Sequence, residues 1–396
     1  MKELFLRKGA ERRVRAGHLW VYSNEVDSTR SPLTGFTAGD CVVVCSSGGQ
    51  ALGSAYMAPN ALICARLYAP GPEAVPLCRE LFQQRLDAAL QMRASCFPKP
   101  FYRLIYGDSD FLPGIVVDRF GDAFVVQFNQ PGLERYQADF LAALLATCAP
   151  SGVLLRGDSR SRREQGLASA NEVIFGSVEA QVLLEENTVV FKAPVHSGQK
   201  TGWFYDHRNS RARLRGWVAQ KSVLDVYSYI GGWGVQAAVF GASSVLCLDS
   251  SEQALAGVLE NAKLNDVADK VTTLRGSAPQ SMATLRDDDK TFDVVVLDPP
   301  AFIQRRRDSK KGIAAYRRIN ELGLQLLNPG GLLVSASCSM HLARADLIGA
   351  IAQAAVRAGC RVQIVEQGGQ APDHPVHPAI PETEYLKAVF VRRLHD

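Results

Sequence analysis

The chain has 396 residues, enough for two or three domains of ordinary size. Its 44 basic and 40 acidic residues give a net charge of only +4, so any nucleic-acid interface must come from local clusters of charge. The nine cysteines include no C-x-x-C pair, which argues against a disulfide framework and a zinc site. No apolar run of about 18 residues and no signal-peptide pattern is present, which predicts a soluble cytoplasmic protein.

The first segment, residues 1–73, is predicted to be a small β-rich module. Residues 17–26, 39–45 and 50–57 alternate or run apolar between Gly and polar turn residues. Exposed aromatic residues such as Trp20 or Tyr22 beside a basic edge would suit RNA binding, although a solvated charged face over core aromatics fits the pattern equally well. The basic residues of this edge are Lys2, Arg7, Lys8, Arg12, Arg13 and Arg15. Gly and Pro within residues 69–76 mark the end of the module.

Residues 74–190 are predicted to form a central α+β domain. Helical spacing occurs over residues 77–94 and 133–147, and residues 115–128 have the pattern of a hairpin that turns at 120–122. Further strands are predicted at 152–157, 172–178, 182–184 and 189–191. Nothing here has a catalytic pattern, so we interpret the segment as a scaffold that helps to hold substrate.

The third domain, residues 191–396, opens with a segment that precedes its first apolar strand. Residues 192–215 are glycine-containing and aromatic, with a helix predicted to begin near Asp206. Such a segment can fold over a cofactor and would contribute Lys200, Phe204, Asp206 and Arg208. A plain linker between domains is the alternative.

Residues 223–235 contain a strand, a glycine turn and the start of a helix, which is the outline of a nucleotide-type pocket. A dinucleotide fingerprint has no acid before its glycines, whereas Asp225 precedes Gly231, Gly232 and Gly234 here. An acid at this point suits a ligand that carries an ammonium, such as S-adenosylmethionine. The next strand, 244–248, ends at Asp249, which is well placed to accept hydrogen bonds from ribose hydroxyls. The alternative is a plain βαβ unit whose glycines only relieve packing.

Alternation of strands and helices then predicts a doubly wound sheet. The pattern Ser250-x-x-Gln253 resembles a capping box and is expected to open the helix 251–264. Residues 291–302 are a β-branched run stopped by two prolines, which predicts a buried parallel strand. The remaining predictions are strands at 271–275, 332–337, 360–366 and 385–392, helices at 279–286, 313–327 and 341–358, and a turn at 328–331.

Two strand ends of this sheet carry residues suited to catalysis. One strand closes on Asp298-Pro299-Pro300 and the next on Ser337-Cys338-Ser339. With the usual strand order, both ends lie beside Asp225. A cysteine thiolate that adds to carbon 6 of a pyrimidine makes carbon 5 nucleophilic enough to take a methyl group, and Asp298 could hydrogen-bond the base. Cys338 as a small buried hydrophobic residue is the alternative.

Residues 304–318 hold seven basic side chains and one acidic side chain directly after the two prolines. A run of this kind is often only a solvated face, but beside a pocket it suits a phosphate backbone. A Cys-His hydrolase using His341 is disfavoured because no third orienting partner is evident. We assign substrate binding to Pro299, Pro300, Phe302, Arg305, Arg306 and Lys310.

The whole chain resembles the bacterial ribosomal RNA large-subunit methyltransferase I family. The matching motifs are GHLWVYSNEV, SGQKTGWFYDHR, DVYSYIGGWGV, LDPPAF, SCS and DHPVHPAIPETEYLK. The resemblance implies an α/β protein with an RNA-binding PUA domain, a central α+β domain and a C-terminal class I (Rossmann-like) methyltransferase domain. It also implies S-adenosylmethionine as cofactor and 5-methylcytosine in 23S rRNA as product.

By that resemblance, Cys338 corresponds to the nucleophile and Asp298 to the acid of the DPP motif, while Asp225, Gly231 and Asp249 fall in the cofactor motifs. We add Tyr227, Gly232, Ser277 and Asp298 to the predicted cofactor site. Tyr227 and Trp233 stand where the family often has Phe, and Ser277 lies where many class I methyltransferases have an Asp toward the adenine amino group. The predicted partner is 23S rRNA or a large-subunit precursor, with no membrane and no metal; a homodimer is left open.

Two alternatives stay open at this point. One is a methyltransferase that acts on uracil carbon 5 or on an exocyclic amine; an amine enzyme would not need Cys338, whereas a uracil enzyme would. The DPP and SCS motifs also resemble RNA uracil-5 methyltransferases, so the preference for cytosine depends mainly on the PUA-like first domain. The other alternative is a non-catalytic RNA-binding assembly protein.

Overall fold

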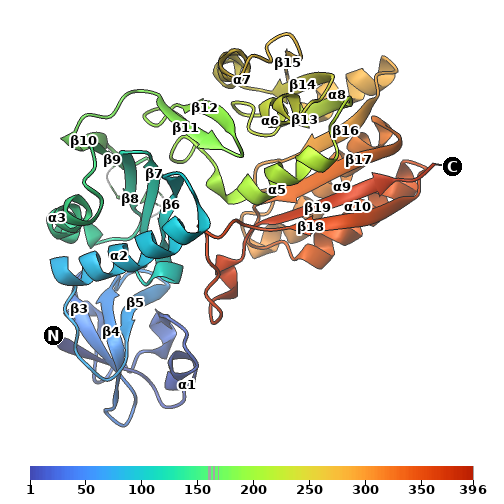
Figure 1. Ribbon diagram of the computed structural model, residues 1–396. Coiled ribbons are helices and arrows are strands. Elements are labelled where there is room, and N and C mark those ends of the chain that lie inside the picture. The colour runs from blue at the N-terminus through green and yellow to red at the C-terminus, as the bar shows by residue number, and fades with distance from the viewer. Residues whose placement is uncertain (159–161, 164–165, 168, 396) are drawn as a thin grey trace. The chain divides into compact units, whose positions relative to one another are not determined.

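The computed structural model describes residues 1–158, 162–163, 166–167 and 169–395 (Figure 1). The chain separates into two units of contacts. The first contains Met1–Val182, Pro194–Trp203 and Pro372–Thr383, and the second contains Leu183–Ala193, Phe204–Ala371 and Glu384–Asp396. Within the described part of the chain, no helix has both the length and the apolar character needed to cross a membrane.

The first unit begins with a five-stranded sheet in the order β1-β3-β4-β5-β2. Its core is built from alternating inward residues such as Val42, Val44, Ala55 and Leu67, all fully buried. The elements of this part are β1 (Lys2–Phe5), α1 (Glu11–Arg15), β2 (Trp20–Tyr22), η1 (Ser23–Glu25), η2 (Leu33–Gly35), β3 (Cys41–Cys45), β4 (Ala51–Met57) and β5 (Ile63–Pro70). The predicted small β-rich module is therefore present.

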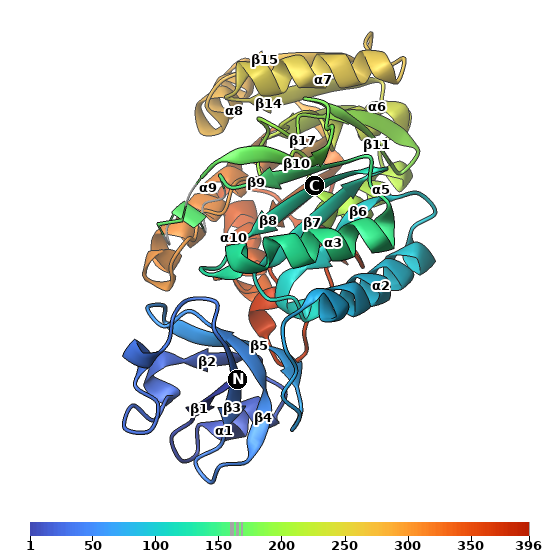
Figure 2. The ribbon, with the colours of Figure 1, turned by 90° about the vertical axis from the view of Figure 1, so that its left-hand side faces the viewer.

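A second five-stranded sheet, in the order β10-β9-β8-β7-β6, carries two helices that pack against each other, α2 and α3 (Figure 2). The predicted hairpin is confirmed, since Phe120 of β7 pairs with Ala123 of β8 across the expected turn. The elements are α2 (Arg79–Cys96), β6 (Phe101–Tyr106), η3 (Gly107–Asp110), β7 (Ile115–Phe120), β8 (Ala123–Phe128), η4 (Leu133–Tyr136), α3 (Gln137–Cys148), β9 (Gly152–Arg156) and β10 (Asn171–Gly176).

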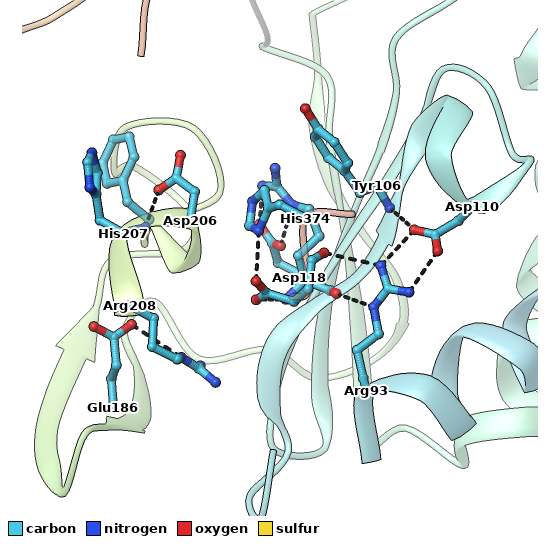
Figure 3. A network of polar contacts seen from close by, with 12 residues as sticks. Arg93, Tyr106, Asp110, Asp118, Glu186, Asp206, His207, Arg208 and His374 are labelled. Carbon is cyan, nitrogen blue, oxygen red and sulfur yellow. Dashed lines mark hydrogen bonds and ion pairs between the residues drawn. The ribbon is translucent and has the colours of Figure 1, made fainter. Parts of the chain in front are cut away.

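A buried ion-pair network fixes the late segment Pro372–Thr383, which includes η8 (Pro381–Thr383), within this first unit. Arg93 makes two 2.7 Å hydrogen bonds to the carboxylate of Asp110 (Figure 3). It makes a further bond to the carbonyl of Asp373. The carboxylate of Asp373 in turn accepts from the backbone N–H of Arg103, whose guanidinium pairs with Asp118. Arg93 and Arg103 thus each pair with a carboxylate, as burial of charges requires.

The second unit contains a seven-stranded sheet in the order β15-β14-β13-β16-β17-β19-β18 (Figure 1). The first five strands in this order, β15, β14, β13, β16 and β17, are parallel, whereas β19 runs antiparallel to both of its neighbours, β17 and β18. The strands are β13 (Ser222–Val226), β14 (Ser244–Asp249), β15 (Val271–Arg275), β16 (Phe292–Leu297), β17 (Leu327–Ser337), β18 (Val362–Gly368) and β19 (Lys387–Arg393). The predicted doubly wound character is thus present, with an antiparallel strand added.

Helices α8, α9 and α10 cover one face of this sheet, where Met282, Ile319 and Leu347 are buried in one cluster with Leu224 and Val295 of the strands. Helices α6 and α7 pack on β14. A two-stranded ribbon, β11 (Val182–Glu186) with β12 (Val189–Ala193), precedes the sheet. The helical elements are η5 (Tyr205–His207), α5 (Arg208–Arg213), η6 (Leu214–Gly216), α6 (Gly234–Val239), α7 (Glu252–Leu264), α8 (Ala278–Asp287), η7 (Arg306–Asp308), α9 (Ser309–Gln325) and α10 (Arg344–Arg357).

Two local predictions were wrong. The helix α7 is capped by Ser251 rather than Ser250, because the Ser251 hydroxyl oxygen accepts the N–H of Ala254 at 3.2 Å. The predicted turn at 328–331 belongs to β17: Gly330 adopts φ +81°, and a register shift between Phe292 and Val294 of β16 accommodates the extra residues. A glycine at positive φ therefore makes a bulge here instead of reversing the chain.

Candidate active site

The carboxyl ends of four adjacent parallel strands bring the predicted site residues to one edge of the sheet. Asp225 of β13 lies in register with Cys247 of β14 and Val296 of β16, and β17 is the next neighbour. Asp298 directly follows β16 and Cys338 directly follows β17. The strand order predicted for these acids and the thiol is confirmed, and it places all four strand ends at the edge where open α/β sheets bind ligands.

Asp225 has the chemistry of an ammonium-binding group. Its side chain is fully buried; one carboxylate oxygen accepts the N–H of Gly234 at 2.8 Å, and the other has no hydrogen-bond partner among the described residues. Burial raises the pKa of this carboxyl to about 7, and the nearby carboxylates of Asp298 and Asp249 act in the same direction against the Gly234 bond. A cation beside the free oxygen would satisfy it and favour the ionised form.

The turn after β13 is strained and tightly packed. Tyr227 and Tyr229 have φ values of +66° and +50°, which is unusual for residues other than glycine, while Gly231 has φ +85°. A Cβ at Gly234 would lie 2.5 Å from the Cys247 sulfur and 3.0 Å from the Asp225 carboxylate. The turn therefore brings backbone close to the carboxylate, which a cofactor cradle requires.

The other predicted cofactor residues of this sheet differ in their surroundings. The half-buried carboxylate of Asp249 accepts the N–H of Tyr229 at 3.0 Å and that of Ser251 at 2.9 Å, so it ties the two turns together. Gly232 is buried in the turn, and burial raises the pKa of the Tyr227 phenol to about 12. Ser277 is exposed just beyond β15 and makes no capping bond with its side chain.

Asp298 is held by two side chains from separate elements. Trp233 donates its indole N–H to one carboxylate oxygen at 3.0 Å, and Nε2 of His207 lies 3.3 Å from the other. Burial by itself would raise the pKa of Asp298, but His207 and the Trp233 bond outweigh it and keep that pKa below the usual range. His207 is not among the predicted site residues, and Trp233 is expected only as a variant of Phe, which has no N–H to donate.

The segment before β13 is built into the second unit by its polar residues. Asp206 is buried and accepts a hydrogen bond from the hydroxyl of Tyr385, while Arg208 lies 3.7 Å from Glu186, a pair shown in Figure 3. Phe204 contacts the Tyr229 ring edge-on, with ring centroids 5.6 Å apart. Lys200 belongs to the first unit, where it is exposed with φ +50°. Asp206 and Arg208 thus have protein partners in addition to any ligand that they bind.

The loop that carries Cys338 is fixed by the serines on either side. The hydroxyl of Ser337 lies 2.8 Å from that of Tyr316 and accepts the N–H of Ser339 at 3.1 Å. Ser339 donates its own hydroxyl to the carbonyl of Ile303 at 2.6 Å and accepts the N–H of Ile303 at 3.2 Å. Both serines are buried while Cys338 is only partly buried, so the loop presents a thiol from a rigid support.

The residues predicted to bind substrate lie between the end of β16 and the first turn of α9. Phe302 packs on Tyr316 with ring centroids 4.8 Å apart, and Pro299 is buried whereas Pro300 is exposed. Arg305, Arg306 and Lys310 are exposed. Helix α9 begins at Ser309, earlier than predicted, so Lys310 lies in its first turn. These cations face solvent, where a polyanion can reach them.

No cluster of three or more His, Cys, Asp and Glu side chains arranged to hold a metal ion occurs among the described residues. The donor set at the strand ends is instead one that fits S-adenosylmethionine. Asp225 offers a free oxygen for the ammonium, the glycine turn offers close backbone, and Asp249 offers a carboxylate to the ribose hydroxyls.

Comparison with known proteins shows which families the chain is similar to. The S-adenosylmethionine-dependent methyltransferase family matches residues 105–392, and a PUA-like domain family matches residues 4–70. The chain is 36% identical over 392 residues to a ribosomal RNA large subunit methyltransferase I of Cronobacter sakazakii, covering 97% of each chain. It is 34% identical over 393 residues to the protein of the same name from Shewanella denitrificans, covering 98% of each.

Solved structures show the same fold. A putative S-adenosylmethionine-dependent methyltransferase from Streptococcus mutans aligns with a TM-score of 0.83 at 20% identity, covering 99% of this chain and 100% of that one. The putative methyltransferase SMU.776, solved with S-adenosylhomocysteine, aligns over the same shares with a TM-score of 0.84 at 19% identity. From the sequence matches, the chain belongs to the ribosomal RNA large subunit methyltransferase I family and is an S-adenosylmethionine-dependent methyltransferase with an N-terminal PUA-like domain.

Proposed function

We propose that this protein methylates carbon 5 of a cytosine in 23S rRNA, with Cys338 as a covalent nucleophile. The observation that carries the proposal is the position of Cys338: a partly buried thiol on a loop fixed by buried serines, at the strand end beside Asp298 and on the sheet edge of Asp225. Methyl transfer to an amine would not need this thiol, whereas transfer to a pyrimidine carbon does.

In the proposed reaction the Cys338 thiolate forms a bond to carbon 6 of the base, which makes carbon 5 nucleophilic. S-adenosylmethionine supplies an electrophilic methyl group on its sulfonium. After transfer, carbon 5 loses its proton to a base, the bond between sulfur and carbon 6 breaks, and the thiolate is restored. Each bond formed to the enzyme is thus broken again, so that Cys338 turns over.

Asp298 is suited to hold the base during these steps. Because its pKa is kept low, it is ionised near neutral pH and can only accept hydrogen bonds. The amino group of cytosine and the ring N–H of uracil are both donors that this carboxylate could bind. The acceptor character therefore suits either pyrimidine, and uracil stays the second candidate.

The cofactor would be held by Asp225, Gly231, Gly232 and Asp249, with Phe204 and Tyr227 beside the turn. The other proposed contacts, all within the second unit, are Asp206, Arg208, Ser277 and Asp298. Exposed Arg305, Arg306 and Lys310 would bind the RNA backbone, and Pro299, Pro300 and Phe302 would line the approach to the thiol. The target base must be single-stranded or turned out of its stack to reach Cys338.

The test is methylation of unmodified 23S rRNA and of large-subunit precursor particles, with nucleosides quantified by mass spectrometry. Wild type and Cys148→Ala, which removes another partly buried thiol, should both yield 5-methylcytidine, whereas Cys338→Ala should yield none. An equally active Cys338→Ala would refute the covalent mechanism. A 5-methyluridine or N-methyl product would favour the second candidate, and no product on either RNA would favour a non-catalytic binding protein.

A further inference from the structure

Lys387 is a buried cation beside the loop of Cys338. It is the first residue of β19 and lies directly opposite Ser337 in the antiparallel pair of β17 and β19. Directly opposite residues in such a pair are neighbours, with Cα atoms about 4.5 to 5.5 Å apart. Lys387 is only 4% exposed, which is rare for a lysine.

The ammonium of Lys387 holds the loop by its backbone. It donates to the carbonyl of Ser339 at 2.7 Å and to the carbonyl of Tyr385 at 2.8 Å. An ammonium has three donors, so one is left for a further acceptor. Because Ser339 follows Cys338 directly, the positive charge is fixed within a residue of the thiol.

Few other charged groups lie near the Lys387 ammonium. In the described part of the chain, no carboxylate lies within 4.0 Å of the Lys387 nitrogen; Glu384 reaches Arg344 of α10 instead, at 4.0 Å. Burial lowers the pKa of Lys387 to about 8 and Arg344 adds to that effect, while Cys338 and Glu384 oppose it. Lys387 therefore keeps its charge at neutral pH, and the group that gains most from that charge is the thiolate.

We propose that Lys387 is a positioning residue for Cys338: its ammonium anchors the thiol-bearing loop and stabilises the thiolate from which methyl transfer begins. The inference rests on the function proposed above, in which Cys338 is the nucleophile. A thiol beside a fixed cation is ionised at lower pH than a free one, since the charged form is favoured by attraction. Lys387 would thus supply a reactive thiolate near neutral pH.

The test is the rate at which iodoacetamide alkylates Cys338 between pH 6 and 10, followed by mass spectrometry of the peptide that contains it. In Lys387→Met, which keeps length but loses charge, the midpoint of the profile should move up by about one pH unit, so alkylation at pH 7 should slow by about five- to tenfold. Lys387→Arg should stay closer to wild type than to Lys387→Met. Lys263→Met, an exposed lysine of α7, is the matched control and should not change the profile.

Thermal unfolding and S-adenosylmethionine affinity, measured on the same variants, separate a chemical effect from a loss of fold. The proposal is overturned if folded Lys387→Met has the wild-type profile, or if folded Lys387→Arg is as slow as Lys387→Met. Alkylation needs no RNA and no turnover, so it tests the Lys387 proposal even if Cys338→Ala proves active. That second result would count against the covalent mechanism alone.

Discussion

Replacing Asp225 by Asn should stabilise the cofactor-free protein while destroying its affinity for S-adenosylmethionine. The carboxylate is buried, has one oxygen without a partner among the described residues, and lies near the acidic groups of Asp298 and Asp249. An amide is neutral and can still accept the N–H of Gly234. The substitution therefore removes a buried charge without removing the bond that positions the turn.

The magnitude follows from the pKa of this group. It is raised from 3.8 to about 7, a difference of about 3, and each whole pKa number corresponds to about 1.4 kcal/mol. The pKa of this carboxyl is about 7 in the folded state and 3.8 in the unfolded state. Its contribution to the free energy of unfolding is therefore complete below pH 3.8 and is lost as the pH rises through 7. The full loss is about 4 kcal/mol as an upper bound, and most of it is reached by pH 7. The advantage of Asp225→Asn should grow over the same range.

Urea unfolding of the cofactor-free protein at pH 5 and pH 8 would measure this difference. The free energy of unfolding of Asp225→Asn relative to wild type should be about 2 to 3 kcal/mol higher at pH 8 than at pH 5. For Asp269→Asn, at an exposed aspartate before β15, this difference should not change with pH. Calorimetric titration should show that wild type binds S-adenosylmethionine more tightly as the pH rises from 6 to 8, since only the ionised carboxylate attracts an ammonium. Equal stability of Asp225→Asn and wild type at pH 8, or unchanged cofactor binding by the variant, would refute the reasoning.

Three further substitutions test the surrounding site. Trp233→Phe removes a hydrogen bond to Asp298 and should raise its pKa, so the acidic limb of the pH–rate profile should move up by about one pH unit while kcat at pH 7 stays close to that of the wild type. Trp217→Phe, which removes an indole bond to Glu366, should leave the limb in place. Ser339→Ala removes both hydrogen bonds to Ile303, so it should lower the free energy of unfolding by about 1 to 3 kcal/mol and slow methylation. Unchanged stability would contradict the proposed support of the loop. Gly234→Ala should destabilise the protein by about 1 to 3 kcal/mol and abolish cofactor binding, because its Cβ would lie 2.5 Å from the Cys247 sulfur. The control is Gly349→Ala in α10, where a Cβ meets nothing within 4 Å, and it should be neutral or stabilising in the same assay.

The strand ends could be predicted from the sequence because each is a local pattern. An acid that closes a buried apolar run marks the carboxyl end of a parallel strand: Asp225 is the last but one residue of β13, and Asp298 directly follows β16. The usual doubly wound order then brought these ends together. The precise caps and turns were less predictable: Ser250 and Ser251 are equally good capping residues by type, and only the backbone geometry decides between them.

The supports of the thiol could not be predicted in this way, since they depend on pairing between distant parts of the chain. Tyr316 reaches Ser337 from α9, and Lys387 reaches Ser339 because β19 pairs with β17. No local periodicity records such a pairing. The sequence contains one indication of His207: it lies between Asp206 and Arg208, which are both predicted cofactor residues. The predicted division at residues 73 and 190 remains a prediction, because the contact units group late segments with early ones.

The position of β19 has a consequence for biosynthesis. This strand comes last along the chain, yet it lies inside the sheet, between β17 and β18. During translation, one edge of β17 therefore stays unpaired until residues 387–393 have left the ribosome. Lys387, which supports the loop of Cys338, is part of the same strand. The sheet of the second unit can therefore be completed only once β19 is available, so a nascent chain that already carries a folded PUA-like module would still lack the lysine that supports the loop of Cys338.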